Sequence, residues 1–187
     1  DNVVISNNKF ATDVNISSIF KLDGYLTIDA NIGTRKVSID SNIFANKIQM
    51  IEISGGDVSI NKNIFGALDT NKAVNFLVPD IGIRSLSSDK LTIHDNFFFG
   101  IQKNAILQTQ SNRDVVISKN RFYNNIEDIN TTSNPNSNVL LIDNTARDGR
   151  QFVTSSGNPE IYFERNNINN YDSVFTNLND PLTRKVR

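Results

Sequence analysis

The chain has 187 residues, 38% hydrophobic and 21% charged, with 29 asparagines, 12 phenylalanines and no cysteine. Asparagine is a poor helix former, and the apolar residues are mainly Ile, Val and Phe, so the composition favours strands over helices. The net charge of −1 argues against nucleic-acid binding, and the absence of cysteine excludes disulfides and thiolate metal sites. No apolar run is long enough to span a membrane. We expect one all-β domain over residues 1–187 without a cofactor, a metal or a membrane-inserted segment.

One short pattern recurs along the chain: apolar, small polar, Ile, two polar residues, Asn, any residue, Phe. Clear copies begin at residues 3, 37, 58, 91 and 115, a copy at 161 has Ile in the Phe position, and weaker copies begin at 26 and 139. Most of their asparagines are 21 to 24 residues apart, whereas Asn63 and Asn96 are 33 apart. Asn31 is only 11 residues before Asn42, so one of these two copies lies on a different side of the coil.

A second strand-like run stands between successive copies, as in Met50–Ile53 and Ala105–Gln108. A unit of two or three such short strands cannot bury its own apolar face. Stacking of equivalent strands from consecutive units into parallel sheets solves this problem. The sequence therefore predicts a parallel β-solenoid of about seven to eight coils.

The repeat resembles that of the right-handed parallel β-helix in the pectate-lyase-like superfamily, which includes pectin-degrading enzymes, sugar epimerases and phage tailspikes. This resemblance implies that the asparagine lies in a tight turn and forms a hydrogen-bonded ladder through the solenoid. The ladder positions are Asn8, Asn42, Asn63, Asn96, Asn120, Asn144 and Asn166. A buried amide can donate to one coil and accept from the next, which supports this placement. The phenylalanine two residues later would form an internal aromatic stack.

Candidate catalytic residues are few, and the catalytic signatures of pectate lyases, polygalacturonases and alginate epimerases are absent. Cleavage of a glycosidic bond needs two carboxyl groups, and Asp143 and Glu164 could approach each other from neighbouring coils. His94, the only histidine, could act as a base or be an exposed turn residue. The charged column that contains Asp143 is also explained by a solvated ladder of alternating charges; its members are Asp95, Lys119, Asp143 and Arg165.

Substrate-binding candidates lie on the second strand of each coil and in two predicted loops. The resemblance implies a cleft on the outward face of one sheet, where Glu52, Asn75 and Asp128 would point outward. The extra residues before Asn96 predict an insertion loop at 79–89, whose apolar side chains either pack on the solenoid or form a contact patch. In a second predicted loop, Arg147 and Arg150 could clamp the carboxylate or sulfate of an acidic sugar.

The predicted function is recognition of a polysaccharide, which could extend to its cleavage, by a secreted, cell-surface or virion protein. An outward face rich in Asn, Ser, Thr and Asp can hydrogen-bond sugar hydroxyls. The alternative is a non-catalytic structural stalk or adhesin. Because a repeat begins at the first residues and the end at 176–187 looks irregular, we expect a fragment of a longer protein, covered by a neighbouring domain or by homotrimer formation.

Overall fold

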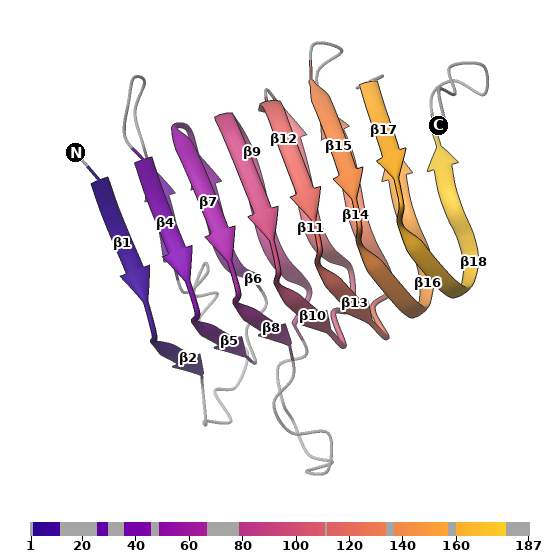
Figure 1. Cartoon of the computed structure of the whole chain (residues 1–187), viewed down its shortest axis with the longest axis horizontal. Helices are drawn as coiled ribbons and strands as arrows, with labels where there is room; N and C mark the ends of the chain where they lie inside the picture. The colour runs from indigo at the N-terminus through magenta and orange to yellow at the C-terminus, as the bar shows by residue number, and fades with distance from the viewer. Residues whose placement is uncertain are drawn as a thin grey trace, which may run out of the picture.

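The computed structural model describes residues 2–11, 26–29, 36–45, 49–66, 79–110, 112–133, 137–156 and 160–178. These residues form parallel strands and turns wound into a β-solenoid, and no helix occurs among them (Figure 1). Every neighbouring pair of strands is parallel, with equivalent residues of successive repeats side by side. The predicted all-β solenoid is therefore confirmed.

Sheet A is one wall of the solenoid and holds the apolar-polar-Ile part of each repeat. In its alternating strands, the Val or Leu and the following Ile point inward, and the residues around them point outward. Its described strands are β1 (Asn2–Ser6), β4 (Lys36–Asp40), β7 (Asp57–Asn61), the end of β9 (Ile81–His94), β12 (Asn112–Ser118), β15 (Asn138–Ile142) and β17 (Glu160–Glu164).

Two further sides complete each turn. The short strands follow the ladder asparagines and are β2 (Lys9–Ala11), β5 (Ile43–Ala45), β8 (Ile64–Gly66), β10 (Phe97–Phe99), β13 (Arg121–Tyr123) and the first parts of β16 (Thr145–Ser155) and β18 (Asn167–Asn177). The third side contains β3 (Leu26–Asp29), β6 (Gln49–Ser54), the first part of β9, β11 (Asn104–Gln110), β14 (Glu127–Ser133) and the ends of β16 and β18.

The predicted asparagine ladder is present at the turn between sheet A and the short strands. From Asn8 to Asn166, the backbone N–H of each ladder residue donates to the side-chain Oδ1 of the next, at 2.8 to 3.0 Å. Each Nδ2 also bonds backbone carbonyls; that of Asn63 donates to the carbonyls of Ile39 and Asn61, both at 2.8 Å. The left-handed backbone belongs to the residue before each asparagine, as at Lys62, where φ is 53°. The ladder bonds offset the cost of that conformation.

The predicted phenylalanine stack lies directly inside this turn. The rings of Phe10, Phe44, Phe65, Phe98 and Phe122 follow one another at centroid distances of 4.8 to 5.1 Å, and their planes are within 9° of parallel. In the next turn the stacking position is Ala146, and Phe152 approaches Phe122 edge-on from the third side at 6.1 Å. The aromatic column is therefore continued by a different residue.

Two predictions about the repeat count are corrected. The Leu26 copy is not a ladder copy, because β3 pairs with β6 on the third side, while β1 pairs directly with β4. The described residues trace about five turns rather than seven to eight. The apolar-polar pattern of Leu26–Asp29 suits either side of the solenoid, which accounts for one of the excess turns.

Both predicted loops are strands. Residues 81–89 belong to β9, with Ile83 fully buried, and residues 145–151 belong to β16. Fourteen residues separate β8 from β9, against four between β10 and β11, so the extra ten residues precede β9. At the other end, Thr176 and Asn177 continue β18, and residues 179–187 lie outside the described residues.

Candidate functional site

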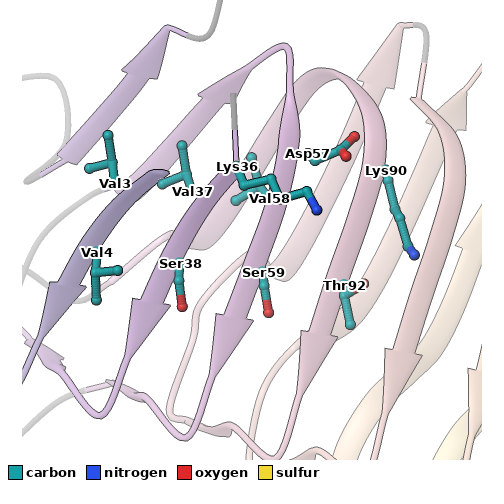
Figure 2. A pocket seen from close by; sticks show the side chains of 10 residues that line it. All are labelled: Val3, Val4, Lys36, Val37, Ser38, Asp57, Val58, Ser59, Lys90 and Thr92. Atoms are coloured by element: carbon teal, nitrogen blue, oxygen red, sulfur yellow. The ribbon is translucent and has the colours of Figure 1, made fainter. Parts of the chain in front are cut away.

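The outer face of sheet A carries a row of short side chains at equivalent positions of neighbouring strands. The row consists of residues paired in register on β1, β4, β7 and β9, namely Val4, Ser38, Ser59 and Thr92. Figure 2 shows them in line across these strands. Each stands between the two inward residues of its repeat, so strand alternation directs it outward. Neighbouring strands are about 4.8 Å apart, so the hydroxyl groups recur at that spacing.

A second row of outward side chains flanks the hydroxyl row two residues earlier in each strand. Lys36, Asp57 and Lys90 are paired in register on β4, β7 and β9. Within the described part of the chain, no ion pair joins these three side chains to one another or to other groups. Two ammonium groups and one carboxylate are therefore available to a ligand beside the hydroxyl row.

These rows line a shallow hollow of about 430 Å³ on the outside of sheet A (Figure 2). Val37 and Val58 also line the hollow, although their side chains point inward and are almost completely buried. The rim is more open at β1, where Val4 is 67% exposed. The hollow combines hydroxyl and charged groups with a lining surface that is mainly apolar. An open surface of this kind suits an extended ligand that has both polar groups and apolar faces, such as a sugar chain.

Of the predicted catalytic residues, His94 lies nearest this hollow, two residues after Thr92 on β9. It occupies the outward column between Asn61 and Ser118, and its Nδ1 is 3.0 Å from the Asp95 carboxylate. His94 is therefore a half-exposed group at the edge of the same face, with Asp95 beside it.

The other two predicted catalytic residues, Asp143 and Glu164, are brought together, but by an arginine. The guanidinium of Arg165 bonds both oxygens of Asp143, at 2.7 and 3.1 Å, and also the Glu164 carboxylate. The hydrogen bond from Arg165 lowers the pKa of Asp143. A general acid needs a raised pKa, so this arrangement suits an exposed ion-pair cluster better than acid catalysis.

The predicted substrate-binding residues do not form one group. Glu52 is on the outer surface of the third side, where it accepts hydrogen bonds from Gln49 at 2.9 Å and Arg84 at 3.4 Å. Arg147 and Arg150 are on β16. This strand is four strand spacings from the β6 strand that carries Glu52, or roughly 19 Å along the solenoid. Their partners are Asp148 at 3.3 Å and Asp172 at 3.8 Å, respectively. Asn75 lies outside the described residues.

Asp128, expected to point outward, is fully buried. On the third side two consecutive residues of each strand point inward, as Asp128 and Ile129 do. The hydrogen-bonded register between β11 and β14 includes Ile129 but not Asp128. Strict alternation therefore fails there. Burial raises the pKa of Asp128 to about 7, although its hydrogen bonds from Tyr171 (2.5 Å) and Asn125 (3.0 Å) act in the opposite direction.

Tyr171 reaches Asp128 because its ring lies over Gly149 of the neighbouring strand. A Cβ at Gly149 would lie 2.4 Å from a ring carbon of Tyr171, so only glycine fits there. Burial, followed by the nearby Asp128 carboxylate, raises the pKa of the Tyr171 hydroxyl above its usual range. This buried pair is a structural feature of the interior, separate from the hollow on sheet A.

The hollow itself was not predicted from the sequence, although a signal was present. Aligning the repeat copies places Lys36, Asp57 and Lys90 immediately before the first apolar residue of each copy. The hydroxyl-bearing residues directly follow that apolar residue. These two columns vary in residue type, so they are a weaker signal than the constant asparagine and phenylalanine columns.

Comparisons with family models, curated proteins and solved structures found no match for this chain. Within the described residues, no helix has the length and apolar character needed to cross a bilayer. Those same residues contain no group of three or more His, Cys, Asp or Glu side chains placed to hold a metal ion.

Proposed function

We propose that this chain binds an extended polysaccharide along the outer face of sheet A. The observation that carries the proposal is the row of Ser38, Ser59 and Thr92 hydroxyls beside the unpaired charges of the hollow. Hydroxyl, ammonium and carboxylate groups together offer donors and acceptors for sugar hydroxyls.

The geometry of a solenoid wall supports this ligand class. Equivalent side chains recur about every 4.8 Å, close to the length of one sugar residue in an extended chain, so successive sugars would meet equivalent groups. The ladder and the phenylalanine stack fix neighbouring strands relative to each other. A preorganised face requires little ordering on binding, which favours affinity for a flexible polymer.

The repeat and the solenoid also support membership of the pectate-lyase-like superfamily, and we place the chain in a secreted, cell-surface or virion protein on that basis. We propose binding rather than cleavage as its activity. Arg165 forms ion pairs with both Asp143 and Glu164, the one carboxylate pair that the sequence suggested, and holds the pKa of Asp143 low.

A binding assay with a panel of neutral and acidic polysaccharides tests the proposal, with a blocking variant of the hollow. Ser59→Trp should abolish binding because an indole would fill the middle of the hydroxyl row. The matched control is Leu107→Trp, at a partly exposed outward position of β11 on the third side. Equal binding by both variants, or no binding of any polysaccharide by the unmodified chain, would refute it. Release of reducing ends or unsaturated sugars would show cleavage instead.

A structural stalk is the second candidate, and the continuity of the interior favours it. The asparagine ladder connects strands from β1 to β17 without interruption, which suits a rigid spacer. A stalk would bind no polysaccharide in the panel. It would also tolerate Ser59→Trp without any loss of function.

A further inference from the structure

We infer that the polysaccharide bound on sheet A is acidic, with a carboxylate or sulfate on alternate sugar residues. This inference rests on the proposed function and adds the charge pattern of the ligand. It comes from the order of charges in the flanking row: positive at Lys36, negative at Asp57 and positive at Lys90.

The spacing of these charges sets the repeat of the ligand. Lys36, Asp57 and Lys90 occupy the same register position on three successive strands, about 4.8 Å apart. The two lysines therefore originate about two sugar lengths apart, and Asp57 stands midway. A glycan running along the hydroxyl row would present alternate residues to the lysines and the intervening residue to Asp57.

The charges are available because they are not satisfied within the protein. Both lysines are exposed, and neither they nor Asp57 has an ion-pair partner within 4 Å among the described residues. Asp114 follows Lys90 in register on β12 but does not line the hollow. The contrast is with the third side, where Glu52 and Arg84 on adjacent strands pair at 3.4 Å.

The central carboxylate gives the row its selectivity. A lysine ammonium attracts a carboxylate or sulfate through a charge-assisted hydrogen bond. Asp57 repels an anionic group on the intervening sugar and can accept hydrogen bonds from neutral sugar hydroxyls. Repulsion of the wrong ligand is an effective source of specificity, so polymers charged on every residue should bind less well than alternating ones.

A simpler role for the same charges is mutual stabilisation of neighbouring strands. Opposite charges side by side on a sheet contribute modestly to stability. In that case the substitutions below would change the melting temperature and leave glycan selectivity unchanged. The experiment therefore measures both quantities.

The test compares three probes by titration calorimetry at low salt: hyaluronan, charged on alternate residues; polygalacturonate, charged on every residue; and dextran, which is neutral. We expect hyaluronan to bind most tightly and its affinity to fall with added salt. Lys36→Gln and Lys90→Gln should each weaken hyaluronan binding by about tenfold, as expected for one lost charge-assisted hydrogen bond. Asp57→Asn should strengthen polygalacturonate binding more than hyaluronan binding.

Matched controls separate charge from folding. Lys90→Arg keeps the charge and should retain most of the affinity, and Lys103→Gln, at an exposed lysine outside the hollow, should have no effect. Dextran binding that equals hyaluronan binding, with unaffected lysine variants, would overturn the charge inference and leave the proposed function standing. Failure of all three probes to bind would overturn both.

Discussion

Two interior corners of the solenoid differ in regularity, and the difference separates what stabilises the fold from what varies within it. At the asparagine corner, every turn uses the same residue in the same role, and each amide bonds the next. On the third side, the equivalent inward column changes from Ile53 to Ser85, Gln108, Thr131 and Ser155. The asparagine corner therefore repeats the same residue and the same contact in every described turn. The third side, which we call the irregular corner, uses different residues and contacts from one turn to the next.

The irregular corner contains a buried amide without a hydrogen-bond partner and a buried carboxyl group. Gln108 is fully buried, and neither of its side-chain amide atoms has a hydrogen-bond partner in the described part of the chain. Asp128 is buried with a raised pKa two positions before Asn130. An unpaired buried polar group lowers stability, whereas the ladder amides raise it. The comparison therefore predicts opposite effects for similar substitutions at the two corners.

The largest effect is expected at the regular corner, from Phe65→Ala. Phe65 is fully buried, and its ring stacks between Phe44 and Phe98 at 5.0 and 4.8 Å. Loss of the ring would leave a cavity in the middle of the column and lower the free energy of unfolding by about 3–5 kcal/mol. Urea unfolding followed by circular dichroism measures this change in the free energy of unfolding. A loss below that of the exposed control Tyr123→Ala would contradict a stabilising role for the stack.

The irregular corner should make stability depend on pH. Asp128 has a pKa of about 7 in the folded chain, against 3.8 for an ordinary aspartate, so between these values the folded state holds a proton that the unfolded state has released. Stability from this group is therefore fully present below about pH 4 and is lost as the pH rises to about 7. The change amounts to up to about 4 kcal/mol.

The matching variant is Asp128→Asn, which keeps the shape but does not titrate. Melting temperatures measured from pH 4 to pH 8 should fall with pH in the unmodified chain, and this slope should be smaller in the variant. Carboxylates that do not interact with Asp128 contribute to the slope of both proteins, so the difference between the two slopes reports on Asp128. Equal slopes of melting temperature against pH in the two proteins would show that Asp128 does not cause the pH dependence.

At the asparagine corner, Asn63→Ala should lower the free energy of unfolding by about 1–3 kcal/mol, because it leaves buried ladder partners unpaired. Those partners include the backbone N–H of Asn42 and the carbonyl of Ile39. Asn138→Ala, at an exposed position of β15, is the control and should change stability little. Equal effects of the two substitutions would remove the distinction between ladder and surface asparagines.

The smallest effect, and one of opposite sign, is expected for Gln108→Met. Methionine has a similar shape and no amide to leave unpaired, so the variant should be more stable by about 1 kcal/mol. Leu107→Met, at the preceding outward position, is the matched control. Destabilisation by Gln108→Met would show that the amide has a stabilising partner.

The sequence predicted the regular corner because its rule is local. Each copy carries its own asparagine and phenylalanine at fixed spacing, so the repeat pattern alone assigns Asn63 and Phe65 to the interior. The third side could not be assigned in this way, because two consecutive inward residues interrupt the alternation and Asp128 was placed on the wrong face. The hollow was harder to predict, since Lys36, Asp57 and Lys90 form a group only when three distant strands stack.

The most direct test of the proposed function is to map a bound polysaccharide by NMR. Titration of the isotope-labelled chain with hyaluronan should shift the backbone amides of β4, β7 and the end of β9, with the largest changes near Ser59 and Thr92. The amides of β11 and β14 on the third side should stay in place. Shifts confined to the third side, or none at saturating hyaluronan and polygalacturonate, would contradict a polysaccharide site on sheet A.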